Sequence, residues 1–205
     1  MTSLRRDGPA LAALFGGVLA LLAAIPPAWY GSRPRQSYLF DPPAFSPLWI
    51  ERELMPVLAV LAALGLLVGL AALVWRDRER SGWLWGTGVA AVLGASLFTI
   101  SLFGLTVASG DTGAPDPYSS IAWLLPGLLG GLLLVVGLVL LGAVYLRRGR
   151  SRLGGVLVAV GPATIGVGVL LPEPVAGVAS AGALAVLGVA LSVELHRGWP
   201  ERGDD

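Results

Sequence analysis

The segment WRDRERSGWLW, residues 75–85, decides how this chain folds, because it places five consecutive charged residues between two long apolar runs. The chain of 205 residues is 55% hydrophobic and only 13% charged, so a charged run of this density marks a boundary. Tryptophans flank it on both sides. The segment is either a short polar link between two membrane helices or a binding patch for an acidic partner.

Outward from this segment, the chain divides into six windows without Asp, Glu, Arg, Lys or His: 8–32, 54–75, 81–110, 117–146, 153–172 and 174–193. Each reaches the length of about 20 apolar residues that a helix needs to cross a bilayer. Backbone groups in lipid must form hydrogen bonds within the segment, which favours helices. We therefore expect one all-α, polytopic membrane domain over residues 1–205. Its transmembrane helices are 9–28, 56–75, 83–109, 121–146, 153–171 and 175–195, with an outer loop at 29–55.

Two of these helices have an alternative interpretation. The first apolar run follows Arg5 and Arg6, as in a secretory signal, but it is long for a signal and lacks a clear cleavage site. The fifth run is short and contains Pro162, so a re-entrant segment would place the C-terminus outside the cell. We expect a retained first helix and a spanning fifth helix.

The arginines predict the orientation. With six helices and a cytoplasmic N-terminus, eleven of the fourteen basic residues face the cytoplasm, and only Arg33, Arg35 and Arg52 face outward. This is a strong positive-inside bias, so we expect a six-helix bundle in the cell membrane with both termini in the cytoplasm. Aromatic residues near the helix ends are typical of interfacial anchors: Trp29, Tyr30, Trp75, Trp83, Trp85, Tyr118, Trp123 and Tyr145.

The RDRER run is then the cytoplasmic link between the second and third helices. The second basic link, RRGRSR, carries Arg147, Arg148, Arg150 and Arg152 and no acid, which makes these residues candidate contacts for anionic lipids. A topology marker is the simpler interpretation of both links, and we favour it. Within the outer loop, Ser46 is expected to cap a short helix that starts at Pro47.

Polar groups inside the expected helices are few. The sequence predicts no ionisable side chain at membrane depth, and it places Glu194 at a helix end within reach of water. Ser96, Thr99 and Thr106 share one helical face and, with the break at Pro162, are candidates for a narrow polar path. The alternative, which we favour for the hydroxyls, is bonding to backbone carbonyls one turn earlier.

Small residues recur at every fourth position. Ala12, Gly16, Ala20 and Ala24 form one face of the first helix, a pattern typical of close helix packing in membranes. Whether this face packs within its own bundle or against another chain is left open. The second and fourth helices each contain a GxxxG pair, Gly65–Gly69 and Gly127–Gly131.

The chain lacks the residues for most chemistry. It has no Cys and one His, so thiol nucleophiles and sulfur-ligated metals are excluded, and a net charge of +1 does not indicate nucleic-acid binding. We expect no catalytic residue, metal site or cofactor.

The predicted function is a non-enzymatic structural or accessory membrane component. Its partners are the lipid bilayer and either another membrane protein or a second copy. The alternative is a carrier or channel for a small neutral or lipid-like solute.

The apolar runs that begin the first and fourth helices resemble each other. A three-plus-three inverted repeat of a transporter would produce such a likeness. Shared Gly, Ala, Leu and Val composition explains it as well.

Overall fold

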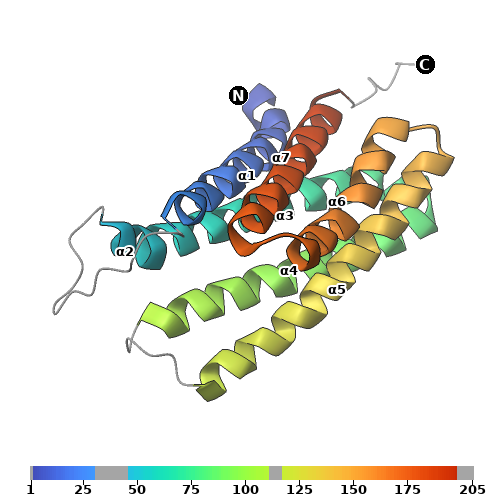
Figure 1. Ribbon diagram of the computed structural model, residues 1–205. Helices are drawn as coiled ribbons and strands as arrows, with labels where there is room; N and C mark the ends of the chain where they lie inside the picture. Colours follow the sequence, from blue (N-terminus) through green and yellow to red (C-terminus); the bar gives the residue numbers. More distant parts are fainter. Residues whose placement is uncertain (1, 31–45, 111–116, 198–205) are drawn as a thin grey trace, which may run out of the picture.

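The computed structural model describes residues 2–30, 46–110 and 117–197, and every regular element in these ranges is helical. The six long helices are α1 (Thr2–Tyr30), α3 (Met55–Asp77), α4 (Gly82–Gly110), α5 (Pro117–Arg147), α6 (Ser151–Leu170) and α7 (Glu173–Arg197) (Figure 1). Three short elements connect to them: α2 (Pro47–Trp49), the π-helical turn η1 (Ile50–Leu54) and the 3₁₀ turn η2 (Arg78–Arg80). Each expected helix corresponds to one long helix.

Five of these helices are long and apolar enough to cross a membrane. Their apolar segments are Asp7–Pro26, Met55–Arg80, Gly82–Val107, Ile121–Arg147 and Val175–Arg197. The corresponding apolar stretch of α6, Ser151–Val167, is shorter. The helices are therefore compatible with a multi-pass membrane protein, which their length and composition support.

The start of α2 agrees with the sequence. The backbone N–H of Trp49 donates to the Ser46 hydroxyl oxygen at 3.2 Å, and Pro47 occupies the first turn, so the predicted cap is confirmed. Residues 31–45 of the expected outer loop, with Arg33 and Arg35, lie outside the described residues.

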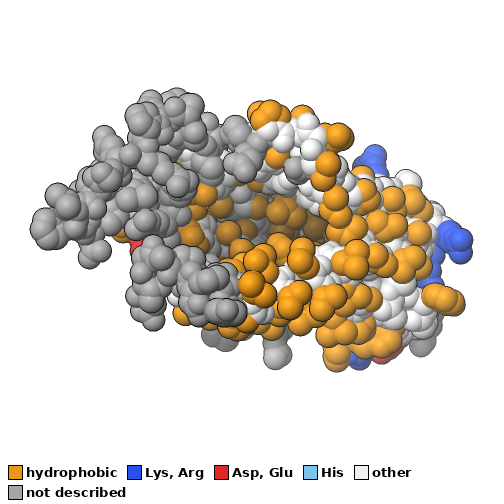
Figure 2. Space-filling model, turned by 60° about the horizontal axis from the view of Figure 1, so that its bottom comes forward, with side chains coloured by type: hydrophobic (Ala, Val, Ile, Leu, Met, Phe, Trp, Pro, Cys, Tyr) orange, Lys and Arg blue, Asp and Glu red, His pale blue; other side chains and the backbone are white. Residues whose placement is uncertain are grey.

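The six long helices form a ring in which each packs against its neighbours in the chain, and α7 closes the ring against α1. Neighbouring helices run antiparallel because short links join most of them. We call the charged end the end of the bundle where α3, α5 and α7 finish and α1, α4 and α6 begin. Arginine side chains gather at one end of the face in Figure 2, and hydrophobic side chains cover much of the rest.

Three of the helices, α1, α3 and α7, are held together by glycines, and we call them the first unit. A Cβ atom built on Gly16 would lie 2.7 Å from the Leu66 backbone nitrogen on α3. One built on Gly188 of α7 would lie 2.5 Å from the Ala13 carbonyl oxygen on α1. No side chain fits between such backbones, so the helices approach closely and gain dispersion contacts.

The other three helices, α4, α5 and α6, form the second unit in the same way. A Cβ on Gly94 of α4 would lie 2.8 Å from the Gly130 carbonyl oxygen on α5. Gly142 of α5 and Gly154 of α6 meet reciprocally, because a Cβ on either would lie 2.8 Å from the other's carbonyl oxygen.

The boundary between the two units, which we call the seam, lacks these contacts. Across it, among the described glycines, only Gly88 of α4 has a neighbour within 4 Å of a built Cβ, and that neighbour is the Val74 side chain of α3. On the α6–α7 side, Gly155, Gly166, Gly177 and Gly182 have no neighbour within this distance. Side chains, rather than backbones, therefore hold the two units together.

Candidate functional site

A buried carboxylate lies at the charged end of the seam. Asp77 ends α3 and is fully buried. A carboxylate at a helix C-terminus is unfavourable because it adds to the negative end of the helix dipole, so it needs compensating partners. The Tyr145 hydroxyl of α5 donates to Asp77 Oδ2 at 2.7 Å, and Arg76 Nε and Arg80 Nε each lie 3.3 Å from Asp77 Oδ1.

A second acid, Glu194 of α7, extends this network. The Arg76 guanidinium donates to the Glu194 carbonyl oxygen at 2.7 Å, and its Nη2 lies 3.4 Å from Glu194 Oε1. Arg76 is thus paired with both acids while its side chain is only 4% exposed. A cation beside the last carbonyls of α7 is also favoured by that helix's dipole.

Arg150 reaches the network from the link between α5 and α6. Gly149 adopts φ = 78° there, a left-handed conformation common where a helix ends, and the Arg150 N–H donates to the Tyr145 carbonyl oxygen at 3.0 Å. This turn directs Arg150 toward Glu194 Oε1, with which it pairs, and places its Nη1 3.7 Å from Asp77 Oδ2. We call Arg76, Asp77, Arg80, Tyr145, Arg150 and Glu194 the ionic cluster.

One helical turn inside the ionic cluster lies an apolar layer. Leu73, Leu141, Leu157 and Leu191, one from each of α3, α5, α6 and α7, are fully buried. Leu73 and Leu141 precede Asp77 and Tyr145 by four positions, and Leu191 precedes Glu194 by three, so each of these leucines lies about one helical turn from a cluster residue. We call these four residues the leucine layer.

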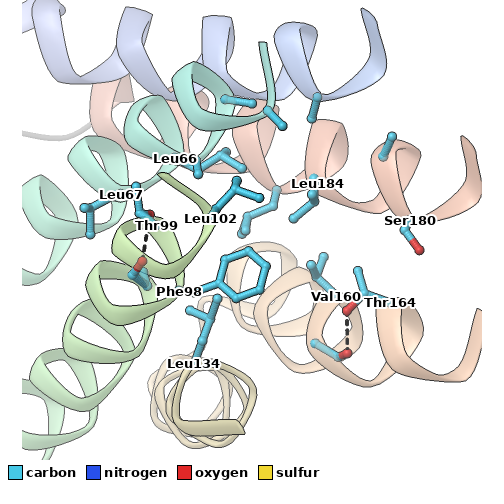
Figure 3. Close-up of a pocket in the computed structure, with 18 of the residues that line it drawn as sticks. Leu66, Leu67, Phe98, Thr99, Leu102, Leu134, Val160, Thr164, Ser180 and Leu184 are labelled. Atoms are coloured by element: carbon cyan, nitrogen blue, oxygen red, sulfur yellow. Dashed lines mark hydrogen bonds between the residues drawn. The ribbon is translucent and has the colours of Figure 1, made fainter. Parts of the chain in front are cut away.

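Beyond the leucine layer, all six long helices surround a cavity of about 450 Å³ near the middle of the bundle. Its lining is almost entirely apolar, and the Phe98 ring points into it (Figure 3). The face in Figure 2 is hollowed, with mostly hydrophobic side chains around the hollow. The size is within the range of about 300–1,000 Å³ that is typical of small-molecule sites.

The cavity contains few polar groups, and two of its hydroxyls are already bonded. Thr99 donates to the Ala95 carbonyl oxygen at 2.7 Å, and Thr164 donates to the Gly161 carbonyl oxygen at 2.8 Å (Figure 3). Ser180 is the third hydroxyl of the lining. The cavity therefore suits an uncharged, largely hydrocarbon molecule.

The four candidates for a polar path are not brought together. Thr99 lines the cavity, but Ser96, Thr106 and Pro162 are not among its lining residues. Ser96 and Thr106 each donate to the carbonyl oxygen four positions earlier, at 2.8 Å. The hydroxyls thus bond their own helix, as the favoured interpretation expected.

The candidate lipid contacts divide into two groups. Arg150 belongs to the ionic cluster, and Arg148 Nη2 donates to the Arg80 carbonyl oxygen of η2 at 3.3 Å. Arg147 and Arg152 are exposed. Two of the four candidates thus already bond other residues of the chain.

The small face of α1 lies inside the chain. Gly16 contacts the α3 backbone, and a Cβ on Gly65 would lie 2.5 Å from the Ala12 carbonyl oxygen. Ala20 and Ala24 line the cavity further along the same face. The described contacts of this face are thus with α3 and with the cavity.

The sequence did not single out the ionic cluster. It predicted no ionisable side chain at membrane depth and charged residues at the helix ends, and Asp77 does end α3, but its full burial was not predicted. Tyr145 was expected as an interfacial anchor at a helix end; it lies near the end of α5, where its side chain is 1% exposed and its hydroxyl donates to Asp77. The available signal was an acid among the arginines of RDRER, at the end of an apolar run.

No protein family, curated protein or solved structure matches this chain.

Proposed function

We propose that this chain is a cell-membrane protein of six spans with both termini in the cytoplasm. The ionic cluster supports this proposal, because it gathers the ends of α3, α5 and α7 and the start of α6 at one end of the bundle. Most arginines belong to this end. A reporter fused after Asp205 that was active only outside the cytoplasm would contradict this orientation.

Within this topology, the chain binds and carries a lipid-like, uncharged molecule in the central cavity. The cavity is the observation that supports this function: it measures about 450 Å³, its lining is apolar, and it lies at mid-height between the two units. Carriers commonly bind their solutes near the bilayer midplane between two groups of helices. A space of this size has room for about 15 groups of the volume of a water or methylene, each about 30 Å³.

A structural or accessory role is the competing proposal. It requires a membrane partner but no occupant for the cavity. The two proposals therefore predict different effects of a substitution that fills the cavity. It would reduce binding of a solute in the cavity, but it would not affect a partner docked on the outer faces of the helices.

The test uses a hydrocarbon alcohol that carries a photoreactive diazirine, added to the protein in lipid nanodiscs. We expect crosslinks to peptides that contain lining residues such as Phe98 and Leu134. Ala63 also lines the cavity. Ala63→Leu fills part of the space and should reduce these crosslinks several-fold.

The matched control is Ala159→Leu, because Ala159 is exposed on α6. It adds the same side chain outside the cavity and should leave the crosslinks unchanged. Crosslinks confined to the outer helix faces, or equal in both variants, would refute binding in the cavity. A membrane protein that co-purifies equally with both variants would then favour the accessory role.

A further inference from the structure

We propose that the ionic cluster is the closed inner gate of a passage through the bundle, and that the two units separate at the charged end to open the cavity toward the cytoplasm. This inference rests on the proposed function, since it gives the cavity an opening toward the cytoplasm through which the bound molecule would move. Three observations carry it: the seam, the distribution of the cluster across the seam, and the leucine layer.

Polar contacts cross the seam at the charged end, beside two apolar ones: the edge-on ring pair Trp75–Trp85 and the approach of the Val74 side chain to Gly88. Tyr145 of the second unit donates to Asp77 of the first, and Arg150 pairs with Glu194. Arg148 donates to the Arg80 carbonyl oxygen. Within the units, by contrast, backbones touch at glycines. A rigid-body motion of one unit against the other would therefore break these side-chain contacts and keep the helix pairs intact.

Separation leaves neither acid of the cluster alone. Asp77 keeps Arg76, its neighbour on α3, and Glu194 of α7 keeps Arg76 as well, since these three residues belong to the first unit. The groups that lose partners are Tyr145 and Arg150. Arg150 is already 32% exposed, so water can replace its partners when the seam opens.

At the ionic cluster itself, separation costs less than separation of an apolar contact of the same size would. Exchanging an ion pair for hydration is close to balanced, whereas exposing apolar side chains to water has no compensation. The leucine layer behind the cluster keeps the closed passage dry. An apolar solute that moves from the cavity past Leu141 and Leu73 would meet hydrocarbon throughout.

The chain has no Cys, so a single introduced thiol reports access without background. We place it in the leucine layer as Leu141→Cys and measure its reaction with a sulfonated, membrane-impermeant maleimide in nanodiscs. Tyr145→Phe removes only the hydroxyl that reaches Asp77, and Arg150→Gln removes the charge that reaches Glu194. We expect each to raise the labelling rate about tenfold, as loss of one hydrogen bond to a charged group implies.

Two controls separate gating from loosening of the fold. Arg152→Gln removes an exposed arginine at the start of α6 and should leave the labelling of Leu141→Cys unchanged. Ser101→Cys is a nearly isosteric thiol, 2% exposed, on the α4 face that contacts Trp123 of α5. It lies within the second unit and should stay protected in every variant.

The possible results are distinct. Faster labelling of Leu141→Cys with protected Ser101→Cys supports the gate. Equal acceleration at both thiols means general loosening and overturns it. The gate is also overturned if Tyr145→Phe and Arg150→Gln change the labelling rate of Leu141→Cys by less than twofold. If diazirine crosslinks in the cavity persist in that case, the proposed binding function stands although the gate does not.

Discussion

The contacts within the two units and the contacts across the seam differ in kind. Within a unit, backbones meet at glycines, as Gly142 and Gly154 do. Across the charged end of the seam, a tyrosine and arginines meet carboxylates and a carbonyl oxygen. Backbone contacts cannot be replaced by water or lipid without a loss of packing, whereas water can replace polar contacts between partly exposed side chains. Under the proposed gate, the bundle is rigid within each unit and separates at the seam.

The largest effect is expected from removing the central charge of the cluster. Asp77→Asn keeps the shape but removes the buried charge that faces Arg76, Arg80 and Arg150, and it leaves Arg76, only 4% exposed, with Glu194 as its one remaining carboxylate. A buried charge that loses its partner typically costs about 3–5 kcal/mol of unfolding free energy. Thermal and denaturant unfolding in mild detergent measures the change.

Glu79→Gln is the control for Asp77→Asn. Glu79 pairs with Arg78 at 3.5 Å on the surface, with its side chain 77% exposed. Exposed pairs contribute about 0–1 kcal/mol, so this change should be small. Equal effects of the two substitutions would mean that burial of the cluster does not matter for stability.

A smaller effect, with a sign that depends on the site, is expected from glycine substitutions. Gly16→Ala would force a Cβ to 2.7 Å from the Leu66 backbone nitrogen and 2.8 Å from the Ala62 carbonyl oxygen. Such overpacking costs about 1–3 kcal/mol of stability. Gly86→Ala adds the same methyl group at a position where no atom lies within 4 Å of the built Cβ. Because alanine has a higher helix propensity than glycine, this variant should be about 0.5–1 kcal/mol more stable than the unmodified chain.

Melting temperatures of the two alanine variants, compared with the unmodified chain, decide this point. Opposite signs are expected. A Gly16→Ala variant as stable as Gly86→Ala would show that α1 and α3 do not meet as closely as the structure has them.

The sequence predicted the helices better than their arrangement. Charge-free windows and prolines are local signals, and they located five of the six long helices to within four residues at each end, whereas α1 begins seven residues before the predicted start. The small face of α1 was also visible in the spacing of Gly16 and its neighbours. Its partner helix was not, because small-residue spacings occur in several helices and specify no partner.

The grouping of helices into units was equally hidden. A three-plus-three repeat would group α1, α3 and α4, but α1 and α3 instead join α7. The ionic cluster depends on contacts between residues 68 and 118 positions apart, Tyr145 with Asp77 and Arg76 with Glu194. Local spacing carries no information about such pairs, so Tyr145 could be interpreted only as an anchor.

The smallest effect is expected inside the cavity, from Thr99→Val. The substitution exchanges a hydroxyl for a methyl of similar size, and the hydroxyl is bonded to the Ala95 carbonyl oxygen of its own helix. That carbonyl oxygen still accepts the helical hydrogen bond, so removing the hydroxyl donor leaves no buried acceptor unpaired. The lining becomes slightly more apolar, and crosslinking by the diazirine alcohol should change less than twofold.

Thr99→Val also distinguishes the two kinds of solute. A polar solute that moved along hydroxyls would need Thr99 to exchange its backbone bond for the solute, and the valine variant would lose transport. A hydrocarbon solute needs only the shape of the lining, which valine keeps. We therefore expect that vesicles take up the diazirine alcohol as well with Thr99→Val as with the unmodified chain, and less with Ala63→Leu. This result would show that the space in the cavity, and not the Thr99 hydroxyl, selects the solute. Loss of uptake in Thr99→Val would instead require a polar path through α4, and the contrast between a polar seam and an apolar cavity would not hold.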